Sequence, residues 1–120
     1  MLGRYSASSE DIIMESVTTP QSRDKRSRYR FHRAKQPHQL MIDEAWRRSG
    51  GITTYLGEWH THPEEDPIPS MIDRISWTKK LMVDNFSEAI FFMILGTATV
   101  RVWEGAHRHP AQHFIGERSI

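Results

Sequence analysis

Apolar and polar positions along the chain change their period from about two to about 3.6 residues, and these periods predict strands and helices. Strands are predicted at residues 2–7, 11–17, 28–31, 55–62, 90–95, 99–103 and, in the polar tail, 113–115. Helices are predicted at residues 37–49 and 70–86. The continuous apolar run at 90–95 is typical of a strand buried on both faces. We therefore expect one α/β (α+β) domain, in which helices flank a mixed, mostly antiparallel sheet.

The second predicted helix has a clear start and an apolar stripe. Ser70 and Asp73 form an S-x-x-D pattern, which is a signature of a helix N-terminus. Four apolar residues at helical spacing form the stripe expected to face the core. They are Ile72, Ile75, Met82 and Phe86. At the start of the first helix, His38 is expected to be solvated.

A basic segment precedes the first helix. Residues 23–35 contain seven basic side chains and one acid, and residues 28–31 alternate charged with aromatic. One interpretation is a solvated edge strand, whose charges prevent pairing with another sheet. The other is a functional basic surface for an acidic partner or a nucleic acid. The sequence leaves both open.

Composition removes several classes of function. The 120 residues suit a single domain, and a net charge of +1 gives no general attraction to nucleic acid or anionic membranes. The chain has no cysteine, which excludes disulfides, thiolate metal sites and cysteine nucleophiles. No apolar run approaches the ~20 residues that span a bilayer, and no signal-peptide pattern is present. We expect a cytoplasmic protein without membrane contact.

The chemically informative stretch is His60-Thr61-His62-Pro63 followed by Ser70 and Asp73. Residues two apart on a strand point from the same face, so both histidine side chains can converge on one ion. Asp73 would approach from the first turn of the next helix. Two histidines and one carboxylate leave a fourth position open, as in catalytic zinc sites. We therefore predict a zinc site formed by His60, His62 and Asp73.

The chain contains a second H-x-H-P copy that tests how specific this pattern is. Eleven residues after His62 stands Asp73, whereas eleven after His109 stands Ile120. The copy that begins at His107 is therefore predicted to be polar surface. The alternative for Ser70 and Asp73 is helix capping alone, and we expect capping to compete with metal binding for the Asp73 carboxylate.

These residues resemble the JAMM (MPN+, JAB-domain) zinc metalloproteases. The motif of that family is an upstream glutamate followed by H-x-H-x(10)-D, with a serine three residues before the aspartate. The segment Gly57 to Glu64, together with Trp46 and Ser49-Gly50-Gly51, is similar to a bacterial branch found with antiviral CBASS operons. The resemblance implies that His60, His62 and Asp73 bind Zn²⁺ and that Ser70 stabilises an oxyanion.

The family's general base is a glutamate in a segment resembling E-x-G-G-x-L-x-G. Residues 1–5 are similar to the end of that segment, so the matching glutamate would lie before Met1. We expect residues 1–120 to form an N-terminally truncated JAB/MPN-like metalloprotease domain without the family's first helix. Glu58 is the substitute candidate, because alternation puts it on the histidine face. Glu64 and Glu65 are expected to be solvated.

The resemblance implies a metallo-isopeptidase that cleaves after the C-terminus of a ubiquitin-like-conjugated protein in bacterial antiviral defence. In that branch the conjugated protein is the operon's nucleotidyltransferase. We expect its tail to lie extended beside a strand and residues 18–35 to grip the conjugated protein. The alternatives are a non-catalytic zinc-binding MPN-type scaffold and a basic nucleic-acid-binding module, for which the chain has no recognised motif.

Overall fold

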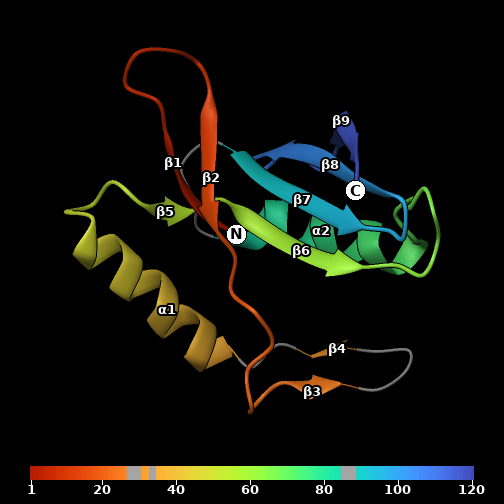
Figure 1. The fold of residues 1–120 in the computed structure, drawn as a ribbon, viewed down its shortest axis with the longest axis horizontal. Coiled ribbons are helices and arrows are strands. Elements are labelled where there is room, and N and C mark those ends of the chain that lie inside the picture. The colour runs from red at the N-terminus through yellow and green to blue at the C-terminus, as the bar shows by residue number, and fades with distance from the viewer. Residues whose placement is uncertain (27–30, 33–34, 85–88) are drawn as a thin grey trace. The chain divides into compact units, whose positions relative to one another are not determined.

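A computed structural model describes residues 1–26, 31–32, 35–84 and 89–120. The chain divides into two compact units, Met1–Leu56 and Gly57–Ile120, and each is described by itself. Among the described residues, each unit contains strands and one helix (Figure 1), which confirms the predicted α+β class. No helix within the described ranges is long and apolar enough to cross a membrane.

The first unit is built on a small antiparallel sheet. Its elements are β1 (Leu2–Tyr5), β2 (Ile12–Ser16), β3 (Lys25–Arg26), β4 (Phe31–His32), α1 (Lys35–Arg48) and β5 (Thr54–Tyr55). β1 lies between β2 and β5, and β3 pairs with β4. The strand predicted at 28–31 coincides with described structure only at Phe31, since residues 28–30 lie outside the described part. The edge strand predicted at residues 28–31 therefore stays a prediction.

His38 corrects one expectation, because its side chain is buried rather than solvated. Only 6% of the residue is exposed. Its Nε2 lies 3.0 Å from Asp24 Oδ2, and its Nδ1 lies 3.0 Å from Thr18 Oγ1. The loop before β3 thus contributes two polar partners that satisfy the buried imidazole. These contacts join residues 14 and 20 positions apart, so the local pattern gave no sign of them.

The second unit is a four-stranded sheet with one helix. Its elements are β6 (Gly57–Thr61), α2 (Met71–Val83), β7 (Ala89–Leu95), β8 (Thr99–Ala106) and β9 (Gln112–Ser119). The strand order is β6-β7-β8-β9, with β6 parallel to β7 and the other pairs antiparallel. The mixed, mostly antiparallel sheet is confirmed. The predicted strand 55–62 is interrupted at Leu56, directly before Gly57, whose φ of +149° favours glycine, and β9 is longer than predicted.

α2 covers one face of this sheet (Figure 1) through Trp77 and Leu81, which are fully buried. The Trp77 ring stacks on Phe92, with 4.5 Å between ring centroids. Leu81 lies against Gly105, where an added Cβ would come within 2.5 Å of Leu81 Cδ1. The helix and the sheet therefore approach too closely at this strand position for a larger residue.

The predicted core-facing stripe of this helix is wrong. Ile72, Ile75 and Met82 are 77%, 64% and 42% exposed, and Phe86 lies outside the described residues. The sheet contacts the neighbouring stripe that contains Trp77 and Leu81, which are four residues apart. The helix carries more apolar residues than the sheet covers, and periodicity alone did not identify the covered side.

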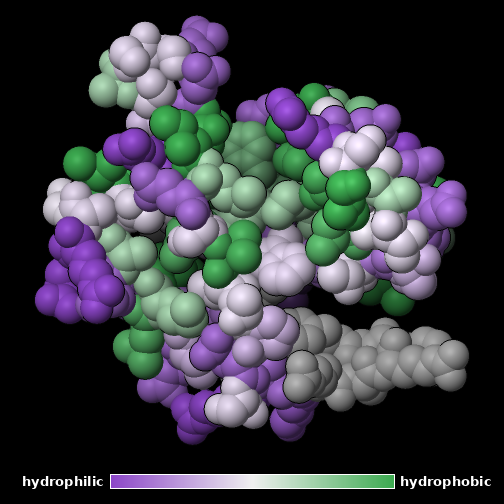
Figure 2. Space-filling model, in the orientation of Figure 1, coloured by the Kyte–Doolittle hydropathy of each residue, from purple (hydrophilic) through white to green (hydrophobic). Residues whose placement is uncertain are grey.

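β7 alternates between two degrees of burial. Ile90, Phe92 and Ile94 are fully buried on the α2 side, whereas Phe91 and Met93 point to the other face and are half-buried. In Figure 2, apolar groups gather over the path of β7 on that other face, which is turned toward the viewer. The prediction of complete burial on both faces is therefore wrong for this second face.

Leu81→Ala should lower the free energy of unfolding by about 2–5 kcal/mol, because it leaves a cavity between α2 and the sheet. Ile72→Ala is the matched control on the same helix and should change this free energy by less than about 0.5 kcal/mol, since the side chain is exposed. Urea unfolding followed by circular dichroism measures both. Equal losses in the two variants would contradict this packing.

Candidate metal centre

Three side chains converge where β6 ends and α2 begins. His60 Nε2 lies 3.1 Å from His62 Nε2 and 3.1 Å from Asp73 Oδ1. His62 Nε2 lies 3.1 Å from Asp73 Oδ2. All three residues are partly buried. The structure thus brings together the three residues that the sequence proposed as zinc ligands.

The donor set and its spacing fit a zinc ion. Tetrahedral zinc with bonds of about 2.0–2.1 Å places neighbouring ligand atoms about 3.3 Å apart. The separations of 3.1 Å between His60, His62 and Asp73 are close to this value. Within the part of the chain that the structure describes, these residues form the group whose possible ligand atoms all lie within 4.8 Å of one another. His107 and His109 do not belong to it.

Asp73 and Ser70 form the predicted helix cap. Ser70 is the N-cap residue, and the Asp73 N–H donates to Ser70 Oγ at 3.1 Å. The N–H and hydroxyl of Ser70 both donate to Asp73 Oδ2, at 2.7 and 2.8 Å. Oδ1 meanwhile faces His60. Oδ2 also lies 3.1 Å from His62 Nε2, so the expected competition between capping and metal binding for this carboxylate stays a prediction.

The Asp73 carboxyl stays ionised over a wide pH range. Its burial raises the pKa, but hydrogen bonds from His60 and Ser70 outweigh that effect and hold the pKa well below its usual value. An ionised carboxylate is the form that binds a metal ion. The cap and the histidine thus keep this side chain ready to act as a ligand.

Comparison with known proteins places the chain in a family. Residues 1–109 match the family described as prokaryotic homologs of the JAB domain. The chain belongs to this family. A CD-NTase/cGAS isopeptidase of Vibrio cholerae serotype O1 is 40% identical over 87 residues, which cover 72% of this chain and 54% of that protein.

Two further relatives agree with this placement. A CD-NTase/cGAS isopeptidase of Escherichia coli strain TW11681 is 32% identical over 96 residues, covering 80% of this chain and 58% of that protein. A probable metalloprotease of Sinorhizobium fredii is 42% identical over 50 residues, covering 41% of this chain and 30% of that protein. The chain spans about half the length of the two isopeptidases. These matches confirm the resemblance to the bacterial JAB isopeptidase branch.

Glu64 of this JAB domain was expected to be solvated, and the sequence analysis did not foresee its contact with His62. Its Oε2 lies 3.0 Å from His62 Nδ1, although 55% of the Glu64 side chain is exposed. A carboxylate on Nδ1 fixes the histidine tautomer and leaves Nε2 available as a metal ligand. The sequence signal that could have indicated this contact is the position of Glu64, two residues after His62 and directly after Pro63.

The loop between the histidines and α2 is fastened to the turn between β7 and β8. The Thr97 and Thr99 N–H groups donate to the carbonyl oxygens of Glu64 and Glu65, at 2.8 and 3.0 Å. An added Cβ at Gly96 would come within 2.6 Å of the Glu64 oxygen, so this approach depends on glycine. The loop that carries Glu64 is therefore held against the sheet by backbone hydrogen bonds.

Glu58 lies on the histidine face of β6 but makes a different contact. Its Oε2 is 3.5 Å from Lys80 Nζ, on the second turn of α2 after Asp73. Glu58 is not part of the group formed by His60, His62 and Asp73. This ion pair points the Glu58 carboxylate toward Lys80. The role of Glu58 as a general base stays a prediction.

His60→Ala and Asp73→Ala should each abolish stoichiometric zinc binding, because two ligands do not hold the ion as tightly as three. His109→Ala is the matched control from the second H-x-H-P copy and should retain one zinc per chain. Elemental analysis after dialysis measures the metal content. Retention of zinc by both site variants would show that the ion binds elsewhere.

Glu64→Ala should weaken zinc binding about 10- to 100-fold without abolishing it, because a supporting carboxylate orients its histidine and raises its basicity. Glu65→Ala removes a neighbouring acid that is also exposed and should leave the affinity unchanged. Competition with a chromogenic chelator gives both dissociation constants. Equal affinities in the two variants would contradict the orienting role of Glu64.

Proposed function

We propose that the complete protein is a zinc-dependent metallo-isopeptidase that hydrolyses the bond between the C-terminus of a conjugated protein and an amine. The observation that carries this proposal is the convergence of His60, His62 and Asp73 beside Ser70, in a chain of the JAB family. Two histidines and a carboxylate leave a zinc position open, which is the arrangement of catalytic zinc.

Each residue of the candidate metal centre has one role in this function. His60, His62 and Asp73 hold the ion, and Glu64 orients His62. Bound zinc supplies Lewis acidity, which lowers the pKa of water and polarises a carbonyl group. The Ser70 hydroxyl donates a hydrogen bond to the oxyanion that develops on the substrate. In the structure the Ser70 hydroxyl donates its hydrogen bond to Asp73 Oδ2. A hydrogen bond to the oxyanion therefore requires rotation of the hydroxyl group.

The names of the relatives support a proposal for the substrate. Two of them are named CD-NTase/cGAS isopeptidases. We infer that this protein cleaves a ubiquitin-like conjugate of a CD-NTase after its C-terminal residue, in bacterial antiviral defence. We infer that the scissile bond lies at the end of a tail that is extended beside a strand near the site.

The zinc-loaded complete protein should release CD-NTase from a CD-NTase conjugate, and a chelator should stop this release until zinc is restored. Ser70→Ala should keep its zinc and lower kcat about 10²- to 10³-fold, because it removes one oxyanion donor. Gel analysis and mass spectrometry of the released C-terminus measure the reaction. Zinc content of the variant comes from elemental analysis.

Two variants control this experiment. Ser70→Thr retains a hydroxyl and a helix cap, so it should keep most of the rate. Glu58→Gln tests the candidate base, since loss of a general base lowers the rate about 10²- to 10⁴-fold. A smaller loss would show that Glu58 acts only with Lys80. Stoichiometric zinc without release of CD-NTase would favour a non-catalytic scaffold instead.

A further inference from the structure

The two histidines of the candidate metal centre are supported in different ways. His62 Nδ1 lies 3.0 Å from Glu64 Oε2, so a carboxylate orients this ring. His60 Nε2 faces Asp73 and His62, whereas its Nδ1 has no hydrogen-bond partner among the residues that the structure describes. Within these residues, packing is therefore the interaction left to set the angle of the His60 ring.

The indole of Trp77 provides a packing surface for His60. The centroids of the two rings lie 6.2 Å apart, and their planes are inclined by 59°. Tilted pairs at this separation are a preferred arrangement of aromatic rings. Trp77 also follows Asp73 by one helical turn. The ring that contacts His60 and the carboxylate that faces His60 thus belong to the same stripe of α2.

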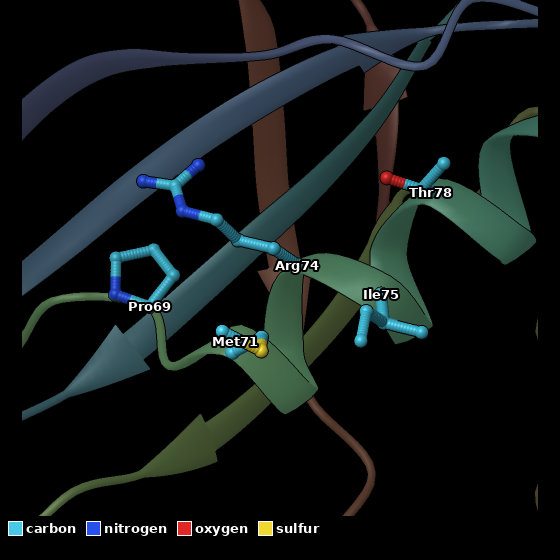
Figure 3. Close-up of a pocket in the computed structure, with 5 residues that line it drawn as sticks. All are labelled: Pro69, Met71, Arg74, Ile75 and Thr78. Carbon is cyan, nitrogen blue, oxygen red and sulfur yellow. The ribbon is translucent and has the colours of Figure 1, made fainter.

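Trp77 is itself held in place by the sheet. Its residue is fully buried, and its ring stacks on Phe92 with an angle of 15° between the planes. On another side it lies against Trp103, with 5.7 Å between the ring centroids. Figure 3 shows the outer side of α2, where Arg74 and Ile75 are exposed. The inner side therefore offers His60 a surface that cannot easily move.

The indole nitrogen of Trp77 is not explained by this packing. Nε1 is buried and has no hydrogen-bond partner in the described part of the chain. A buried N–H without an acceptor is unfavourable, and a phenyl ring would avoid that cost. The indole is however the wider ring, and it contacts both Phe92 on β7 and His60 on the neighbouring β6. Its width thus connects the core to the metal centre.

We propose that Trp77 is a positioning residue of the metal centre, which holds the His60 ring so that Nε2 faces the ion. Glu64 orients His62 by a hydrogen bond, and Trp77 orients His60 by packing. The inference rests on the zinc site of the proposed function and not on turnover. Without the indole the His60 ring can rotate, so zinc binding has to order this side chain at a cost in conformational entropy.

Trp77→Met in the complete protein should weaken zinc binding about 10- to 100-fold, the range for residues that orient a metal ligand. Methionine suits this position because it fills irregular gaps in a core. Trp77→Phe keeps an aromatic ring beside His60 and should lose less than about 10-fold. Competition with a chromogenic chelator gives the dissociation constants, and circular dichroism shows that each variant is folded.

Leu81→Ala is the matched control for lost core packing. Leu81 is as fully buried as Trp77 and lies on the same stripe of α2. It follows Asp73 by eight positions, about 12 Å along the helix axis. Its removal should therefore change the zinc affinity by less than about 3-fold, although it destabilises the fold.

A second measurement needs no metal. In the zinc-free protein, the ring signals of His60 in nuclear magnetic resonance spectra are assigned by their loss in His60→Ala. They should be narrow in the wild type and broadened in Trp77→Met, because the ring then samples several orientations. The linewidth is the diagnostic quantity, since loss of the indole changes the chemical shift in any case. The ring signals of His62, which Glu64 contacts, should stay narrow.

The proposal is overturned if Trp77→Met loses no more zinc affinity than Leu81→Ala, or if its His60 signals stay narrow. Failure of the proposed function has a different signature. In that case the wild-type protein binds no zinc, while the linewidths of His60 in the zinc-free wild type and Trp77→Met still decide whether Trp77 holds this ring.

Discussion

The parallel pairing of β6 with β7 is the constraint on which the metal centre depends. Parallel neighbours cannot be joined by a hairpin, so the chain must cross back over the sheet, and α2 makes this crossing. A returning helix starts near the carboxyl end of the first strand. His60 and His62 stand at that end, and Asp73 lies in the first turn of α2. The topology therefore brings the three side chains together before any metal is bound.

The interactions that order this region are also those that prepare the site. Asp73 completes the α2 cap through Ser70, and the same contacts hold its carboxylate ionised beside His60. Glu64 contacts His62 from a loop that is hydrogen-bonded to the β7–β8 turn. A substitution at Ser70 therefore acts on helix stability and on the position of the Asp73 carboxylate together, which is why a threonine is the informative companion to an alanine at that position.

Local spacing explains what the sequence could predict. The histidine pair and the S-x-x-D box depend on residues within a few positions of one another, and the structure brings them together as expected. His38 was misjudged because its partners, Asp24 and Thr18, lie 14 and 20 residues away. The buried side of α2 was misjudged because several apolar residues competed for it, and only the sheet decides between them. The catalytic roles of Ser70 and Glu58 depend on a reaction and remain predictions.

The candidate metal ligand on α2 lies on the helix face that packs on the sheet. Asp73, Trp77 and Leu81 recur every four residues, so the metal ligand belongs to the same stripe that packs on the sheet. Trp77 follows Asp73 by one turn and is pinned against Phe92. The turn that carries the Asp73 carboxylate is therefore held in place by the packing of α2 on the sheet.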